Sequence, residues 1–130
     1  GLPATIGAAL AESMRETPRA VIGLIGDGSY LYYPQSIYTA VRYDIDLTVL
    51  IPDNRNYRIL KDNTLSIMGG TEDDYEFIGM DFDPHVDIPA TAGGHGAEAK
   101  LIESSDELAT ALETSLSSSD PTVLDTLVHD

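Results

Sequence analysis

Two short apolar runs constrain this chain most, because each one stops at a polar turn. The first, VIGLI, covers residues 21–25 and leads into Asp27, which lies between two glycines. The second, LTVLI, covers residues 47–51 and leads into a turn that contains Asn54. Short runs of β-branched and other apolar residues bounded by turn residues are typical of buried strands. We therefore expect two buried strands, each followed by a polar turn.

The segment between these runs has the pattern of a helix. Pro34 can occupy a first helical position, and Ile37, Ala40 and Val41 follow at spacings of three and four. A strand, a crossover helix and a second strand imply a parallel pair, whose carboxyl ends meet at one edge of the sheet. Open α/β folds bind ligands at that edge, so we expect Asp27 and Asn54 to converge there.

A carboxylate and a carboxamide oxygen on adjacent turns suit Mg²⁺, which takes few side chains and leaves other positions to water and phosphate. Gly26 and Gly28 can adopt positive φ, and Ser29 offers a hydroxyl beside backbone N–H groups that can surround an anion. The pattern predicts a binding site for a magnesium diphosphate. A lone GDG is more often a plain turn, and only its combination with the Asn-bearing turn favours the metal site.

The GDGS motif, followed at this distance by an Asn-bearing turn, resembles the signature of thiamine-diphosphate-dependent enzymes. The segments GLPATIGAALAE and SIYTAVRYDIDLTVLI resemble the benzoylformate decarboxylase and acetolactate synthase group in particular. The resemblance implies Mg²⁺ bound by Asp27, Asn54 and the main-chain carbonyl of Asn56. The first Asn of the family's usual pair is Asp53 here. The residues expected to bind the cofactor, thiamine diphosphate, are Gly26, Gly28, Ser29, Asn54 and Tyr57.

The same resemblance places Ile59, Leu60 and Asn63 in a substrate pocket, although Ile59 and Leu60 could equally be core residues. It implies decarboxylation of a small-molecule 2-oxo acid; the alternatives are an acetolactate synthase-like carboligase and a non-catalytic cofactor-binding module. No catalytic residue is expected in this chain. The activating glutamate of the family comes from the pyrimidine-binding domain of a neighbouring subunit, which implies a homodimer or homotetramer.

Composition limits the class of protein. The chain has 130 residues, of which 42% are hydrophobic, enough for the core of one domain. It contains no apolar run long enough to span a bilayer and no signal-peptide pattern at its start, so we expect no membrane contact and a cytoplasmic location. The absence of cysteine excludes disulfides and thiolate metal sites, which again favours Mg²⁺.

Charge is the other strong compositional feature. The formal net charge is −15, from 22 acidic and 7 basic residues, which argues against nucleic acid as a partner. Molar salt screens repulsion between surface charges, so the composition resembles that of halophilic proteins. An ordinary acidic mesophilic protein is the alternative.

The rest of the chain completes an α/β fold, a parallel sheet with helices on both faces. A helix is expected over residues 4–14 with Ile6 and Leu10 on one face, and strands over residues 97–102 and 122–128. Because Gly1 opens directly on a family motif, residues 1–130 are interpreted as one partial domain, truncated at its N-terminus, with the pyrimidine-binding and middle domains absent.

Four segments receive more local predictions. Residues 64–83 are expected to form a solvated loop, with a mobile lid as the alternative, and Asp83 to cap a short helix that ends at the paired glycines 93 and 94. Ser104 or Ser105 is expected to cap a helix in which leucines recur every four residues. Tyrosine side chains after the first turn are expected to pack, and the three histidines to have surface or cap roles. The leucines are Leu108, Leu112 and Leu116, the tyrosines are Tyr30, Tyr32 and Tyr33, and the histidines are His85, His95 and His129.

Overall fold

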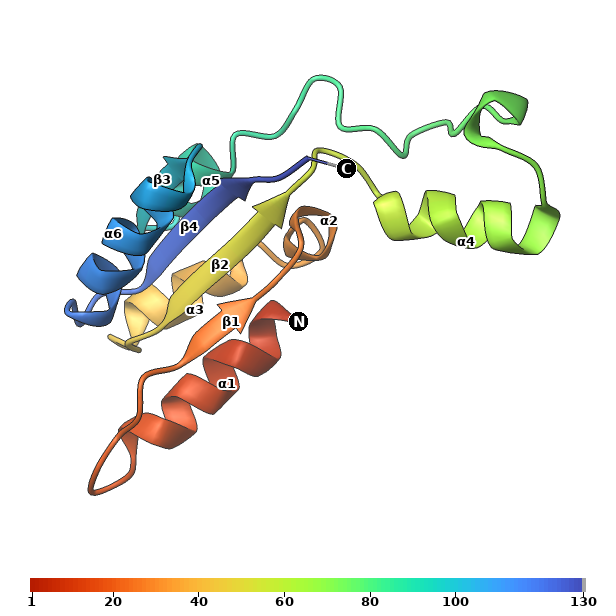
Figure 1. The fold of residues 1–130 in the computed structure, drawn as a ribbon. Helices are drawn as coiled ribbons and strands as arrows, with labels where there is room; N and C mark the ends of the chain where they lie inside the picture. The colour runs from red at the N-terminus through yellow and green to blue at the C-terminus, as the bar shows by residue number, and fades with distance from the viewer. Residues whose placement is uncertain (130) are drawn as a thin grey trace.

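The structure, a computed structural model, describes residues 1–129, and these contain a four-stranded sheet in which every pair is parallel (Figure 1). The strands are β1 (Ile22–Leu24), β2 (Thr48–Asp53), β3 (Glu98–Ile102) and β4 (Thr122–Leu127), in the spatial order β1-β2-β4-β3. β2 and β4 form the centre, with Leu50 beside both Leu24 and Leu124. The predicted α/β class with a parallel sheet is confirmed.

Helices lie on both faces of this sheet. Those packed on the sheet are α1 (Leu2–Ser13), α3 (Ser36–Arg42), α5 (Ile88–Gly94) and α6 (Ser105–Leu116). The short α2 (Asp27–Tyr30) follows β1, whereas α4 (Arg58–Met68) extends away from the sheet and leads to a 3-10 turn, η1, at Glu72–Asp74 (Figure 1). α6 covers the opposite face from α3 and α5, and Thr48 Oγ1 of β2 donates to Ser115 Oγ of α6 over 3.1 Å. Within the described residues, no helix is both long and apolar enough to cross a membrane.

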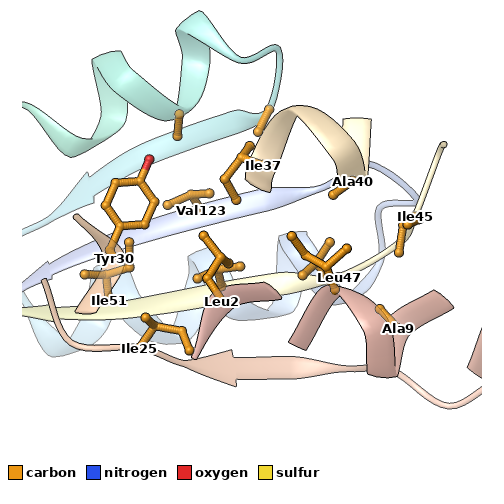
Figure 2. Close-up of a cluster of buried hydrophobic side chains, with 14 of the residues drawn as sticks. Leu2, Ala9, Ile25, Tyr30, Ile37, Ala40, Ile45, Leu47, Ile51 and Val123 are labelled. Carbon is orange, nitrogen blue, oxygen red and sulfur yellow. The ribbon is translucent and has the colours of Figure 1, made fainter. Parts of the chain in front are cut away.

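The main core lies between the sheet and the helices α1, α3 and α5 (Figure 2). Alternate residues point into it from β2 and from the position just before it, since Leu47, Val49 and Ile51 are all almost fully buried. Ile37 and Ala40, three residues apart on one face of α3, are buried in the same core. This packing fixes β1 and β2 relative to each other, and with them the two polar turns at their carboxyl ends.

Several apolar side chains of β1, α1 and α6 are exposed. β1 is buried on one face only, because Ile22 and Leu24 are 50% and 68% exposed. Leu10 is 42% exposed, since Ala9, three residues after Ile6, takes the buried position on α1. In α6, Leu108 and Leu112 are half-buried, but Leu116 is exposed and Ser115 is buried in its place.

The second half of the chain is more helical than predicted. α4 continues to Met68 instead of giving way to a loop at residue 64. The cap of α5 is Asp87 and not Asp83, because Asp87 Oδ1 accepts from the Ala90 N–H over 2.9 Å and Pro89 can occupy only the first turn. Both glycines 93 and 94 lie inside α5, and the left-handed position that follows is Gly96, with a φ of 94°.

The predicted cap of α6 and the predicted histidine roles were correct. Ser104 Oγ accepts from the Glu107 N–H over 3.3 Å, so Ser104 is the cap and Ser105 is the first helical residue. His85 and His129 are exposed, and His95 is the C-cap of α5. None of the three lines the cavity described below.

Candidate functional site

A cavity of about 310 Å³ lies where β1 and β2 end. Its walls come from the turn after β1, the turn after β2 and the first turn of α4. Asp27 and Asn54, predicted to converge from sequence, both lie on its wall. The lining residues are Gly26, Asp27, Gly28, Ser29, Tyr32, Pro52, Asn54, Asn56, Tyr57, Arg58, Ile59, Leu60 and Val128.

Asp27 is a buried carboxylate with an unused oxygen. It is only 6% exposed, and its Oδ1 accepts from the N–H of Gly28 over 2.8 Å. No group of residues 1–129 donates a hydrogen bond to its Oδ2. Burial, together with the nearby carboxyl of Asp53, raises the pKa of Asp27 to about 6. A buried anionic oxygen without a partner is costly, and a bound cation would remove that cost.

The turn after β2 is shaped by its own side chains. Asp53 Oδ1 accepts from the N–H of Arg55 over 2.8 Å, and Arg55 adopts a left-handed φ of 60°. Asn56 donates from its N–H to Asn54 Oδ1 (3.3 Å) and from its Nδ2 to the Asn54 carbonyl (2.9 Å). An amide oxygen has two lone pairs, so Asn54 Oδ1 can accept this bond and still bind a metal.

This turn also explains why the first residue of the usual Asn pair can be Asp53. Asp53 is 4% exposed and does not line the cavity; its carboxylate serves the turn through the Arg55 N–H. An asparagine oxygen would make the same hydrogen bond. The departure from the family pattern therefore leaves the cavity wall unchanged.

The glycines of the turn after β1 have ordinary backbone angles, and Gly28 is needed for the space it leaves. Gly26 is extended, with φ −61° and ψ 151°, and neither Gly26 nor Gly28 has a positive φ, contrary to expectation. A Cβ at Gly28 would lie 2.5 Å from Cε1 of Tyr57, far inside van der Waals contact. Glycine is required at position 28 because the Tyr57 ring lies against it.

The residues predicted for the substrate pocket divide into two groups. Ile59 and Leu60 line the cavity and are 74% and 43% exposed, so they are not core residues of the described structure. Asn63 is exposed further along α4, outside the cavity. Of the tyrosines, Tyr30 packs as predicted and lies 3.1 Å from Thr91 Oγ1 through its hydroxyl, whereas Tyr32 is 63% exposed and lines the cavity.

Sequence reasoning missed Arg58 as a cavity residue. Its Nε lies 3.0 Å from Asp62, one turn ahead on α4, and its Nη1 lies 2.6 Å from Glu72 of η1. The spacing of four to Asp62 is a recognisable helical ion pair and could have placed Arg58 on α4. The pairing to Glu72 joins residues that are distant in the chain, so no local pattern contains it.

The oxygen donors on the cavity wall fit a hard cation. Across residues 1–129, no group of three or more His, Cys, Asp or Glu side chains is placed to hold a metal ion. The candidate ligands are instead one carboxylate, one amide oxygen and one main-chain carbonyl. Mg²⁺ is commonly bound with only one or two carboxylates when phosphate oxygens complete its octahedron, so the residues present fit Mg²⁺ bound to a diphosphate.

A second buried acid, Asp125 on β4, lies behind the site. It is 2% exposed, and no group in the described chain donates to its Oδ1. Burial is the main reason that the pKa of Asp125 rises to about 7, and the carboxylates of Asp53 and Asp27 add to it. The folded protein therefore retains a proton at Asp125 up to a pH at which the unfolded chain has lost it.

We expect Asp125 to make the free energy of unfolding fall as pH rises from about 4 to 7. In that window the folded state binds more protons than the unfolded state, so stability decreases with pH. Asp125→Asn should make this slope smaller, leaving the part due to the raised pKa of Asp27, and raise stability at pH 8 by roughly 2–4 kcal/mol. Urea denaturation of both proteins from pH 5 to 8 measures this effect. Parallel pH profiles for the two proteins would contradict it.

Comparison with known proteins gives a consistent result. Residues 1–126 match the family model described as "Thiamine pyrophosphate enzyme, C-terminal TPP binding domain". The chain is 33% identical over 125 residues to benzoylformate decarboxylase of Pseudomonas aeruginosa, covering 96% of this chain and 22% of that protein. It is 32% identical to 3D-(3,5/4)-trihydroxycyclohexane-1,2-dione hydrolase of Halalkalibacterium halodurans, covering 93% of this chain and 18% of that protein.

A solved structure agrees. The fold superposes on benzoylformate decarboxylase from Polynucleobacter necessarius with a TM-score of 0.89 at 33% identity, over 98% of this chain and 23% of that one. The chain thus spans about a fifth of the length of the relatives it matches.

Proposed function

Because the chain belongs to the thiamine pyrophosphate (thiamine diphosphate) enzymes, as their C-terminal cofactor-binding domain, we propose that it binds magnesium thiamine diphosphate in a 2-oxo acid decarboxylase. The magnesium assignment is supported mainly by the buried Oδ2 of Asp27, which accepts no hydrogen bond from residues 1–129. Asp27 also lines the same cavity as Asn54 and Asn56. The relatives include decarboxylases and a hydrolase, so the choice of decarboxylation is part of the proposal.

Both turns contribute to the metal site and to cofactor binding in this proposal. Asp27 and Asn54 bind Mg²⁺ through side-chain oxygens, and Asn56 binds it through its main-chain carbonyl. Ser29 and the N–H groups around Gly28 bind the diphosphate, with Gly26, Asn54 and Tyr57 contacting the cofactor beside them. When bound, the cofactor supplies the nucleophilic carbon and the electron sink for loss of CO₂.

The α4 side of the cavity receives the 2-oxo acid. Ile59 and Leu60 are hydrocarbon side chains that exclude water from the reacting groups but cannot transfer a proton. We therefore assign proton transfer to groups outside this chain. The partner in this proposal is the pyrimidine-binding domain of a neighbouring subunit in a homodimer or homotetramer, which would supply the activating glutamate.

Assay of the full-length protein tests this function. Decarboxylation should depend on both Mg²⁺ and thiamine diphosphate, and removal of the metal with a chelator should abolish it. CO₂ release from pyruvate and from benzoylformate, each with and without Mg²⁺, is the measurement. Tight cofactor uptake without turnover of any 2-oxo acid would contradict the enzyme proposal and support a binding module instead.

We also propose that the excess of acidic residues is an adaptation to high salt. The net charge of −15 generates repulsion that is screened as the Debye length falls to roughly 3 Å in molar salt. A gain of about 1 kcal/mol would raise the thermal midpoint by roughly 4 °C. We expect the midpoint to rise from dilute buffer to molar KCl, measured by circular dichroism. A midpoint independent of KCl would contradict the adaptation.

A further inference from the structure

Residues 80–82, here called the strap, lie beside the turn that carries Asn54 and Asn56. Asn56 and Asp81 form an isolated antiparallel bridge. The N–H of Tyr57 donates to the Met80 carbonyl over 2.7 Å, and the N–H of Phe82 donates to the Arg55 carbonyl over 2.8 Å. The strap therefore pairs with the residues on each side of Asn56, whose own carbonyl is a proposed metal ligand.

Side-chain contacts connect the strap to the turn after β1 as well. The rings of Phe82 and Tyr57 meet edge to face, with centroids 4.8 Å apart and planes at 89°. The Tyr57 ring in turn lies against Gly28, where any Cβ would collide with it. Phe82, Tyr57 and Gly28 thus form one line of contacts from the strap to the turn after β1.

The strap is also attached to α4. Lys61 is 9% exposed, and its Nζ lies 2.5 Å from Asp81 Oδ1. A buried ammonium needs an anionic partner, so this pair holds the strap close to the start of α4. Backbone bonds, a ring contact and an ion pair all hold the strap in the same position.

We propose that the strap is a positioning element for the magnesium diphosphate site, and that Phe82 is its main positioning residue. This inference rests on the proposed function. Phe82 fixes the Tyr57 ring against Gly28 and so holds the two cofactor-binding turns at one separation. Without the Phe82 ring, the Asn56 carbonyl and the Tyr57 side chain are less ordered, and cofactor binding must itself order them.

The test compares Phe82→Ala with Phe77→Ala in the full-length protein. Phe77 is a control for the aromatic contact with Tyr57. It is half-buried in the same segment and its ring lies 6.0 Å from that of Tyr75 and 5.8 Å from Lys61 Nζ, but it does not contact Tyr57. Phe82→Ala should raise the Mg²⁺ concentration for half-maximal thiamine diphosphate binding by about 10-fold or more, as loss of outer-shell partners does at other metal sites. Phe77→Ala should leave that concentration unchanged.

Two further measurements separate positioning from general loss of structure. At saturating Mg²⁺ and cofactor, kcat of Phe82→Ala should equal that of the parent protein, and Phe82→Tyr should restore the parent Mg²⁺ requirement. If Phe82→Ala does not fold, Phe82→Leu keeps the apolar volume without the aromatic edge, and the same rise is expected.

An unchanged Mg²⁺ requirement in the folded Phe82 variant, or an equal rise in Phe77→Ala, would overturn the positioning role while leaving the proposed function standing. Failure of the parent protein itself to bind the cofactor with Mg²⁺ would overturn both.

Discussion

Asp27→Ala should weaken Mg²⁺-dependent binding of thiamine diphosphate by more than about a hundredfold, because loss of a direct ligand should exceed the 10–100-fold loss typical of outer-shell partners. Asp27 is the one carboxylate on the cavity wall, and its Oδ2 has no hydrogen-bond donor among residues 1–129. Without it, the diphosphate charge is poorly neutralised. Asn54→Ala should weaken binding in the same direction. Titration calorimetry of the full-length protein at saturating Mg²⁺ measures both variants.

Asp46→Ala is the matched control for this prediction. It removes the same charge from an exposed residue just before β2, at the opposite edge of the sheet from the cavity. Its affinity for the cofactor should equal that of the parent protein. If the affinity of Asp27→Ala also equals that of the parent protein, Asp27 is not a ligand of the metal.

Ile59→Ala should shift substrate preference toward benzoylformate over pyruvate by roughly ten- to a hundredfold. Ile59 lines the cavity at the second residue of α4, and a β-branched side chain in a helix has one strongly preferred χ1 rotamer. It therefore cannot move aside for an aromatic ring. Overpacking a rigid pocket costs about 1–3 kcal/mol, and each 1.36 kcal/mol corresponds to a tenfold change in rate. The parent protein should accordingly prefer short aliphatic 2-oxo acids.

The measurement is the ratio of kcat/KM for the two substrates in the full-length protein. Ile67→Ala is the control, because Ile67 lies on the same helix, is 81% exposed and does not line the cavity. It should leave the ratio unchanged. A parent protein that already prefers benzoylformate, with a ratio that Ile59→Ala does not alter, would show that Ile59 does not contact the substrate.

The part of the site that could be predicted from sequence is the part built by adjacent strands. The runs before Asp27 and Asn54 have the composition of strands, and a parallel pair brings its carboxyl ends together whatever the other details of packing. Asp27, Asn54 and Asn56 accordingly line the same cavity. The resemblance to thiamine-diphosphate enzymes, confirmed by the family match, rests on these residues.

The parts that sequence could not give depend on contacts between distant residues. The exposure of Ile22 and Leu24 depends on which elements cover β1. An apolar run does not indicate whether one face of a strand is covered or both. The Arg58–Glu72 pair and the Phe82–Tyr57 contact both join α4 or its start to a segment that reads as an acidic loop. The positions of Ala9 and Ser115 in place of leucines show that tertiary packing, and not side-chain type, chose the buried face of each helix.

The most direct test of the magnesium diphosphate site is a crystal structure of the full-length protein with thiamine diphosphate and Mn²⁺ in place of Mg²⁺. Mn²⁺ shares the preference of Mg²⁺ for oxygen ligands and gives an anomalous signal that locates the ion. We predict an anomalous peak within about 2.5 Å of an Asp27 carboxylate oxygen, the Asn54 amide oxygen and the Asn56 carbonyl, with the diphosphate beside Ser29. An ion bound elsewhere, or a diphosphate that does not touch the turns after β1 and β2, would contradict this account.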